Sequence, residues 1–398
     1  MAAWLVRLAL LTPAAALLAF GIFAGDAWYE RHVLLPALNP PPPSWAFPAL
    51  RLLGLGMGLA LGVGGALAAR RATLGGVARS VLAAALAVCA SEGVLQLLYR
   101  GLPAPRTRLE AHLATPDPRT GWSFVPRRRV DLPMPGDRLI RYETDAYGDR
   151  ASSAEWTEDP RAPSILIAGE SVAMGHGLPW PQTFAARLGD LMQLQVVDVA
   201  EGGYGNDQAY LRAAAALARL SRPSAVVTTV LPVQLHRNLR DDRPHLVLRD
   251  GALVWVPASA SWLKLRQLFV NDLPYLSEAD LARSLALARA ILRTTAALAR
   301  AKGAQPLFVF LCVGRSRPVD AHAEASIIHS LLDGLPYIVF DLEPERMLPG
   351  DFGHPDAEGA RQLAAAIAEA FDAFAQNTRK AASPTTRDHV LASRTAFP

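Results

Sequence analysis

Three apolar stretches near the start of the chain restrict its possible folds more than any other feature of the sequence. They run from Leu8 to Ala24, from Leu52 to Ala69 and from Ser80 to Tyr99. A helix of about 20 apolar residues spans the hydrocarbon core of a bilayer. We therefore expect residues 1–103 to form a membrane region with about three transmembrane helices, followed by a globular domain.

Each of these stretches allows an alternative. The first follows Arg7 and ends in small residues near Ala24, as a cleaved signal sequence does, but the two later stretches favour an uncleaved anchor. Glu92 and Gln96 interrupt the third, either as its polar outer end or as a functional carboxylate inside the membrane. Glycines of the second stretch either permit close helix packing or simply make the span glycine-rich. They are Gly54, Gly56, Gly58 and Gly62.

The arginines that flank the stretches predict an orientation. Those of the second connection are Arg70, Arg71 and Arg79. Because positive charge favours the cytoplasmic side, we expect a multi-pass protein of the cell (inner) membrane whose globular domain is extracytoplasmic. The basic residues after the third stretch count against this orientation, but large domains are exported largely regardless of such charge. These residues are Arg100, Arg106 and Arg108.

The overall composition excludes several classes of protein. The 398 residues are 51% hydrophobic and 19% charged, too apolar for a disordered chain and too charged for one that lies wholly in the membrane. The net charge of +4 is scattered, which does not indicate a nucleic-acid binder. Cys89 and Cys312 form no C-x-x-C pair or Cys/His cluster. We therefore expect no structural zinc, and we expect no disulfide because Cys89 lies in an apolar stretch and Cys312 in a predicted buried strand.

From about residue 104 to 376 the sequence alternates strand-like and helical segments. The expected strands are 164–168, 196–199, 225–230, 307–311 and 337–340, and the expected helices lie near 181–192, 207–220, 278–301, 320–333 and 355–374. This alternation predicts a three-layer α/β domain with a parallel sheet. Residues 245–256 have the pattern of an inserted hairpin with Asp250-Gly251 as its turn. We expect the tail, residues 377–398, to be disordered.

A serine follows the first predicted strand, in Gly169-Glu170-Ser171. Ligands of parallel sheets bind beyond the carboxyl ends of the strands, so this is a place for chemistry. A glycine permits a sharp turn there, which leaves the Ser171 hydroxyl exposed and its own amide ready to hold an oxyanion. The alternative is a serine that only caps the next helix.

A glycine-rich loop follows the second strand, in Glu201-Gly-Gly-Tyr-Gly-Asn206. Such a loop lets the backbone approach a ligand closely, and Gly203 offers a second oxyanion amide. The spacing of these glycines does not fit a dinucleotide-binding loop, and the chain has no phosphate-binding Gly-Lys-Ser/Thr sequence.

The last strand precedes Asp351-Phe-Gly-His354-Pro355. We expect Pro355 in the first turn of a helix, with His354 at its entrance. A carboxylate three residues earlier can hold the imidazole so that Nε2 takes a proton from a serine. A local capping interaction is the alternative. The order Ser, Asp, His is that of an esterase triad, but Ser171 lacks the Gly-x-Ser-x-Gly elbow of α/β-hydrolases.

These motifs resemble those of the SGNH, or GDSL-type, hydrolases. Residues 169–171 are similar to the first block of that family, with Glu for Asp, residues 202–208 to the second and residues 351–355 to the fifth. The resemblance implies a flavodoxin-like sheet over about residues 120–376, with Ser171, Asp351 and His354 as catalytic residues and the Gly203 amide in the oxyanion hole. The asparagine of the third block is missing, and Gln234 is the first choice to replace it, before Asn206 and Asn238.

We therefore expect a membrane-anchored serine esterase or deacylase. Its substrate would be an acyl or acetyl ester, on a glycan or lipid of the cell envelope. No metal or organic cofactor is implied. An O-acyltransferase that uses the same serine is one alternative, and a non-catalytic scaffold of polysaccharide assembly is another. His176, five residues after Ser171, either contacts substrate or is an ordinary loop histidine.

Overall fold

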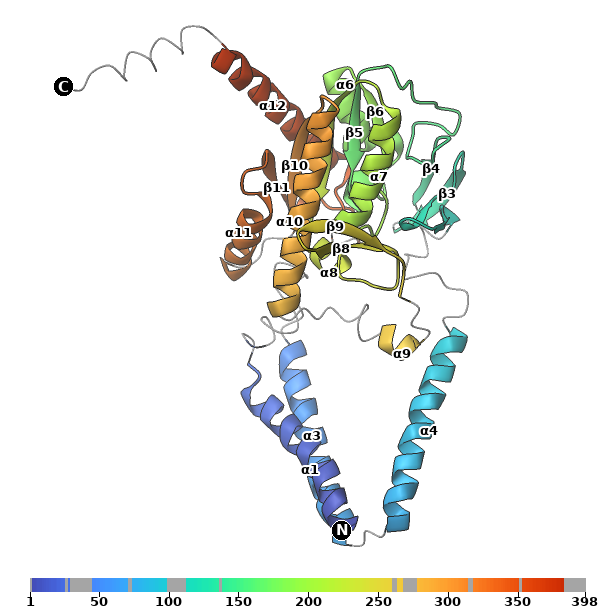
Figure 1. Cartoon of the computed structure of the whole chain (residues 1–398), viewed down its shortest axis with the longest axis vertical. Helices are drawn as coiled ribbons and strands as arrows, with labels where there is room; N and C mark the ends of the chain where they lie inside the picture. The colour runs from blue at the N-terminus through green and yellow to red at the C-terminus, as the bar shows by residue number, and fades with distance from the viewer. Residues whose placement is uncertain are drawn as a thin grey trace, which may run out of the picture. The chain divides into compact units, whose positions relative to one another are not determined.

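The computed structural model divides the chain into two compact units (Figure 1). Unit 1 comprises Met1–Pro105, Leu239–Pro244 and Pro257–Ser284, and unit 2 comprises Arg106–Asn238, His245–Val256 and Leu285–Pro398. The residues that the structure describes are 2–25, 28, 45–70, 74–98, 112–135, 138–259, 263–267, 278–313, 318–350 and 353–382.

A five-stranded sheet forms the centre of unit 2. Its strands are β5 (Ser164–Ala168), β6 (Gln195–Asp198), β7 (Pro223–Val230), β10 (Gln305–Val313) and β11 (Tyr337–Leu342). All neighbours are parallel, in the order β11-β10-β7-β5-β6. The carboxyl ends of the five strands therefore meet at one edge of the sheet.

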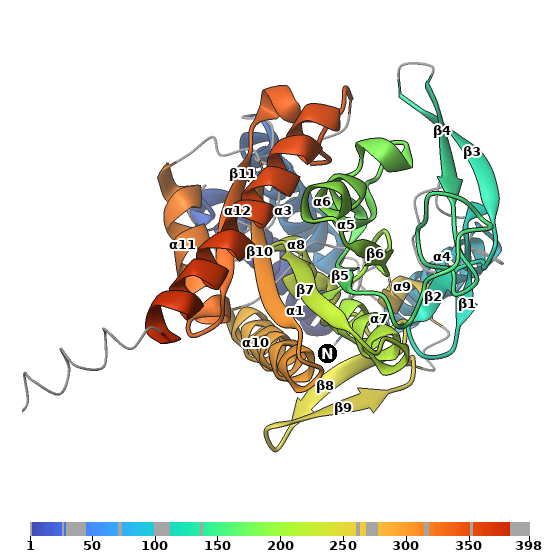
Figure 2. The ribbon, with the colours of Figure 1, turned by 90° about the horizontal axis from the view of Figure 1, so that it is seen from above.

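Helices cover both faces of this sheet. They include α6 (Phe184–Met192), α7 (Asn206–Arg219), α10 (Glu278–Ala301), α11 (Pro318–Leu332) and α12 (Ala357–Ala382). Along β5, Ile165 and Ile167 pack in one apolar cluster with α6 and α12, while Leu166 packs in another with α7 and α10. Figure 2 shows these two pairs of helices on opposite sides of the strands. The three-layer α/β prediction is confirmed, and the alternation within β5 follows from the period of two in a strand.

The predicted strands are all present, and the predicted helices differ mainly at their ends. The helix predicted for 355–374 begins at Ala357, because Pro355 forms a β-bridge with Met347 and the Asp356 carboxylate accepts a hydrogen bond from the Gly359 amide. The expectation that Pro355 lies in the first helical turn is therefore wrong. The helix also continues to Ala382, so the segment predicted to be a disordered tail begins with helical residues, and 383–398 lie outside the described residues.

Three hairpins complete unit 2. They are β1 (Ala114–Asp117) with β2 (Gly121–Phe124), β3 (Arg129–Met134) with β4 (Arg138–Glu143), and β8 (His245–Arg249) with β9 (Ala252–Val256). The third was predicted, and both residues of its turn, Asp250 and Gly251, have positive φ as the Asp-Gly sequence requires. The first two were not predicted, because their short strands carry charged and proline residues that weaken the strand pattern.

Unit 1 contains the helices of the N-terminal region. They are α1 (Ala2–Phe23), α3 (Ala46–Arg70) and α4 (Leu74–Leu98), with the short α9 (Lys264–Gln267). Within the described residues, one stretch, Ala46–Leu67, is long and apolar enough to cross a membrane. The apolar parts of the two other long helices, Leu11–Phe23 and Ala85–Leu97, are shorter than that criterion.

Glu92 of α4 has a local structural role. Its carboxylate is buried and accepts hydrogen bonds from the backbone amides of Lys264, at 2.7 Å, and Leu265, at 2.8 Å. These amides begin α9 and have no partner within that helix. Glu92 therefore holds a later segment of the chain, a contact that neither sequence interpretation of this carboxylate included.

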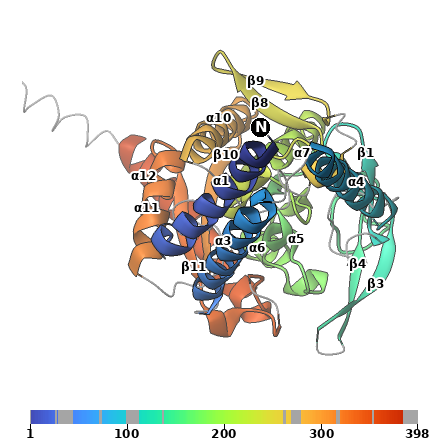
Figure 3. The same ribbon diagram turned by 90° about the horizontal axis from the view of Figure 1, so that it is seen from below.

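Helices α1 and α3 pack closely and antiparallel through glycine (Figure 3). A Cβ at Gly58 would lie 2.8 Å from Leu18 Cγ and 3.0 Å from the carbonyl oxygen of Ala14. Gly54 likewise faces Phe20, whereas a Cβ at Gly56 would meet nothing within 4 Å. The sequence left open whether these glycines serve packing, and the structure shows that two of them do, at the spacing of one helical turn.

We predict that Gly58→Leu separates α1 from α3 and destabilises unit 1 by about 1–3 kcal/mol, because the new side chain collides with α1 backbone. Gly56→Leu is the matched control, since it adds the same side chain to the same helix where there is open space. The measurement is the melting temperature of the full chain in detergent. Equal melting temperatures for the two variants would contradict the packing described here.

Candidate active site

Ser171 opens a short helix directly after strand β5, which lies between β7 and β6 in the sheet. This helix, α5, spans Ser171–Met174, and Glu170 is its N-cap, with a carboxylate that accepts a hydrogen bond from the Val172 amide at 3.0 Å. Ser171 is 9% exposed. The strands on either side of β5 are β6 and β7, so the loops that follow these two strands flank the serine.

Gly169 makes the turn from β5 into α5 possible. A Cβ at this position would lie 2.0 Å from Thr229 Oγ1 of the neighbouring strand β7 and 2.8 Å from the Ala173 Cβ. No side chain fits between these atoms, so the requirement for glycine is steric. The close contact with β7 is what sets Glu170 and Ser171 at the edge of the sheet.

His354 approaches the serine from the side of the sheet formed by the edge strand β11. It lies on the loop between β11, an edge strand, and α12. This loop is held by the buried Leu348, whose side chain contacts Gly177 so closely that a Cβ there would lie 2.3 Å from Leu348 Cδ1. His354 Nε2 lies 2.7 Å from Ser171 Oγ, a hydrogen-bond distance between a nucleophile and a base.

Glu170 shares the same hydroxyl. Its Oε2 lies 2.7 Å from Ser171 Oγ, and the carboxylate is 2% exposed. A serine hydroxyl carries one proton, so it donates to either Glu170 or His354 and not to both. Nucleophilic attack with His354 as the base requires the form in which the hydroxyl donates to the imidazole.

A second histidine stacks on the first. The rings of His176 and His354 have centroids 4.4 Å apart and are inclined by 38°. His176 is 7% exposed, and its backbone amide donates to the Ser171 carbonyl at 2.9 Å. From the sequence alone this residue was more simply interpreted as an ordinary loop histidine. Its place against His354 was not foreseen, because the stacking joins two loops far apart in the chain.

Asp351, the predicted partner of His354, lies outside the described residues. Its predicted role therefore stays a prediction. The nearby Asp356 faces the start of α12, where it caps the helix.

The glycine loop after β6 is held from both sides. The amide of Glu201 donates to the Gly169 carbonyl at 3.4 Å, which connects this loop to the turn before Ser171. The Tyr204 hydroxyl donates to the Trp122 carbonyl of β2 at 2.8 Å. Gly203 lies between them with a φ of +78°, a conformation that favours glycine. Gly203 lies on the loop after β6, the strand beside β5, where the sequence predicted it.

Gln234 belongs to a buried amide network after β7. It lies on α8 (Val233–Arg237), and its Oε1 accepts from Asn206 Nδ2 at 3.0 Å and from the Leu231 amide at 2.8 Å. Asn206 and Asn238 also exchange hydrogen bonds, at 2.8 and 2.9 Å. The Nε2 group of Gln234 is buried and has no protein acceptor within the described part of the chain. Of the three amides considered from the sequence, Gln234 thus keeps a side-chain donor unused.

Arg150 supports the loop after the serine, a role that sequence analysis did not find. Its guanidinium is buried and donates to three backbone carbonyls, those of Met174 and Gly175 at 2.7 Å and that of Leu178 at 2.5 Å. It also lies 4.1 Å from the centroid of the Tyr142 ring. Burial lowers the pKa of Arg150 from its ordinary value.

An acidic cluster beside Arg150 is part of an ion-pair network. The carboxylates of Asp145, Asp149 and Glu158 lie close together and are buried. Both oxygens of Asp149 are used by Arg212 and Arg219, and Glu158 pairs with Arg219 at 2.6 Å. Burial raises the pKa of Asp145 to about 6. Because the two arginines already neutralise charge here, this cluster does not require a metal ion.

Comparison with known proteins finds similarity to solved structures. A member of the lipolytic protein G-D-S-L family from Veillonella parvula is 12% identical with a TM-score of 0.32, covering 53% of this chain and 99% of that chain. An acetyl xylan esterase from the rumen bacterium Butyrivibrio proteoclasticus is 12% identical with a TM-score of 0.31, covering 54% of this chain and 64% of that chain. A GDSL-like lipase from Bacteroides thetaiotaomicron is 15% identical with a TM-score of 0.30, covering 52% and 87%. No family model and no curated protein matches the sequence.

We predict that Glu201 makes stability fall as the pH rises. Burial raises its pKa from 4.5 to about 8 although Arg212 favours the charged form, so between these values the folded protein keeps a proton that the unfolded chain has lost. Glu201→Gln stays neutral and can still accept from the Phe124 amide, as Glu201 does at 3.1 Å. Between acidic and mildly alkaline pH, we expect the free energy of unfolding to fall by about 2–4 kcal/mol less in the variant than in the wild type.

The measurement is the apparent melting temperature across that pH range, with Glu155→Gln at an exposed position as the control. The same pH dependence in the wild type and in Glu201→Gln would show that Glu201 is charged throughout.

Proposed function

We propose that the chain is a membrane-anchored serine esterase that removes acyl or acetyl groups from a glycan or lipid of the cell envelope. The observation that supports this activity is the 2.7 Å distance between Ser171 Oγ and His354 Nε2, at the edge of the sheet where the strands end. A nucleophile and a base within hydrogen-bond distance are what acyl transfer requires.

The reaction has two stages. Ser171 Oγ attacks the ester carbonyl carbon while its proton passes to His354 Nε2, and His354 then gives that proton to the departing alcohol oxygen as the C–O bond breaks. The acyl group is now an ester of Ser171. Water, deprotonated by His354, attacks this ester, the acid leaves, and the proton returns to the Ser171 oxygen.

Three donors are assigned to the oxyanion that forms in each stage. They are the backbone amides of Ser171 and Gly203 and the Nε2 group of Gln234. The support for Gln234 is that its Oε1 is fixed by two donors while its buried Nε2 is unused within the described residues. A donor that is already oriented costs no reorganisation when charge develops, which is why such groups accelerate acyl transfer.

Asp351 is assigned to His354 Nδ1, where a carboxylate would fix the tautomer and stabilise the imidazolium. The two-acceptor arrangement at Ser171 gives this pairing a second effect. A carboxylate at Nδ1 would hold the imidazole in the orientation that accepts the hydroxyl proton, so Asp351 would favour donation to His354 over donation to Glu170.

The membrane assignment starts from the stretch Ala46–Leu67. We propose that α1 and α4 also cross the bilayer and that unit 2 is extracytoplasmic, as the arginines around the second connection favour. An anchored esterase meets acylated glycans and lipids of the envelope at the surface where it is held, which supports that class of substrate over a soluble metabolite.

We predict that a fluorophosphonate probe labels the full chain in detergent and that Ser171→Ala and His354→Ala each abolish labelling. The probe reacts with a serine only when a base removes its proton. Labelling is read by fluorescence after denaturing electrophoresis, and circular dichroism shows that each variant is folded. A folded wild type that does not react would overturn the proposed nucleophile and favour a scaffold. Labelling together with acyl transfer to an added glycan, instead of to water, would favour an O-acyltransferase.

We predict that Gln234→Ala lowers kcat for p-nitrophenyl acetate about 100- to 1,000-fold, because the transition state loses one oxyanion donor. Asn238→Ala is the control, since it disrupts the same buried network without removing that donor. We expect this control to lower the melting temperature with a much smaller effect on kcat. Equal losses of kcat in the two variants would mean that the network supports the site only structurally.

A further inference from the structure

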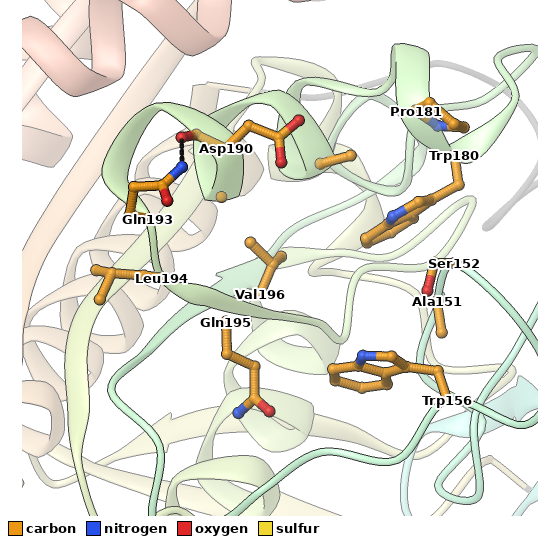
Figure 4. Close-up of a pocket in the computed structure, with 12 residues that line it drawn as sticks. Ala151, Ser152, Trp156, Trp180, Pro181, Asp190, Gln193, Leu194, Gln195 and Val196 are labelled. Atoms are coloured by element: carbon orange, nitrogen blue, oxygen red, sulfur yellow. Dashed lines mark hydrogen bonds between the residues drawn. The ribbon is translucent and has the colours of Figure 1, made fainter.

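Unit 2 has a concave site that the proposed chemistry does not use. It is a groove of about 640 Å³ beside the edge strand β6, within the size range of small-molecule sites. The residues lining it come from α6 and β6, from the turn before α6 and from the segment after Arg150, and none of the proposed catalytic or oxyanion residues is among them. Figure 4 shows the groove with its side chains.

Two tryptophans give the groove its character. Trp156 packs on the apolar cluster of one face of the sheet and Trp180 on that of the other, so both indoles are anchored in the fold. Both remain partly exposed, and Figure 4 shows their rings projecting into the same open space. Within the described part of the chain, neither indole N–H has a protein acceptor. The groove therefore offers two fixed aromatic faces and two free donors.

Polar groups surround these rings. Ser152 and Asp190 are exposed, and the structure gives their side-chain oxygens no partner among the described residues. Gln195 is held in place by Asp159, with which it exchanges hydrogen bonds of 2.8 and 3.1 Å. Gln193 is fixed in the same way, because its Nε2 donates to the Asp190 carbonyl at 2.7 Å. The described residues of the lining include no lysine, arginine or histidine.

We infer that this groove binds a neutral saccharide. A sugar ring has apolar C–H faces, which pack on flat aromatic rings, and a rim of hydroxyls, each of which donates and accepts hydrogen bonds. Fixed indoles with surrounding amide, hydroxyl and carboxylate groups match both features. An anionic ligand is disfavoured because Asp190 is the one charged residue among the described residues of the lining. An added peptide strand is disfavoured because Arg150 already pairs with the free edge of β6 at Asp198.

This inference does not rest on the proposed esterase activity, since the groove and the serine site share none of the described residues. If both hold, the groove retains a polymeric glycan while Ser171 acts on another part of it. When one glycan is bound in the groove, the effective concentration of its other parts at the serine site rises, so two contacts of modest strength together bind the polymer well.

The test is saturation-transfer difference NMR on the full chain, titrated with cellohexaose, mannohexaose and N-acetylchitohexaose. The detergent must have no sugar headgroup, because such a headgroup would itself compete. We expect at least one oligosaccharide to bind saturably, with a dissociation constant of about 0.1–10 mM. Trp156→Ala and Trp180→Ala should each weaken binding about tenfold or more, and Trp180→Phe should restore part of it.

The matched control is Trp255→Ala, which removes an exposed tryptophan of β9 outside the groove and should leave binding unchanged. Ser171→Ala should also bind normally, which separates this test from that of the esterase. Melting temperatures show that the variants are folded. Absence of saturable binding by all three oligosaccharides, or binding that survives both tryptophan substitutions, would overturn the inference. Saturable binding of an extended peptide, with no binding of the sugars, would overturn the inference and favour addition of a peptide strand to β6.

Discussion

The candidate site depends most on the hydrogen bonds between the buried guanidinium of Arg150 and the loop after α5. Removing a charge from water is costly, and it is tolerated only where hydrogen bonds and opposite charge replace the lost hydration. Three backbone carbonyls of the loop after α5 and the ring of Tyr142 supply that replacement. In return, Arg150 supplies a donor to the carbonyls of Met174 and Leu178, while the Gly175 carbonyl also accepts from the Leu178 amide at 3.2 Å. Arg150 thus helps to fix the loop that carries His176.

The proton of Ser171 has two acceptors at the same distance, and this shapes the chemistry of the site. Glu170 is held as the cap of α5, so its carboxylate cannot move away without exposing the Val172 amide. The resting hydroxyl is therefore shared between a group that anchors the helix and a group positioned for catalysis. The reactive arrangement is the one in which the hydroxyl donates to His354.

The sequence predicted the layers of unit 2 well, because strands such as β5 and β7 are largely buried on both faces and rich in apolar and β-branched residues. Ser171 and His354 were predicted to meet, since parallel strands bring their following loops to one edge. The role of Arg150 could not be predicted, because its partners are backbone carbonyls, which every sequence contains. The sequence also could not predict that Gln234 Nε2 lacks an acceptor among the described residues. That depends on the donation of hydrogen bonds from Asn206 and Leu231 to Gln234 Oε1. The paired hairpins before β5 were missed because they are held by tertiary contacts such as that between Tyr204 and Trp122.

The division into two units has a consequence for where the chain can be divided. Leu239–Pro244 and Pro257–Ser284 belong to the unit of the N-terminal helices, while the hairpin between them belongs to the other. Glu92, in α4, supplies the carboxylate that begins α9 in the second of these segments. Loss of the N-terminal helices would therefore leave backbone groups without partners in the middle of the remaining chain. The boundary near residue 105 is therefore not a point at which the protein can be divided cleanly, because two later segments of the chain belong to the unit of the N-terminal helices.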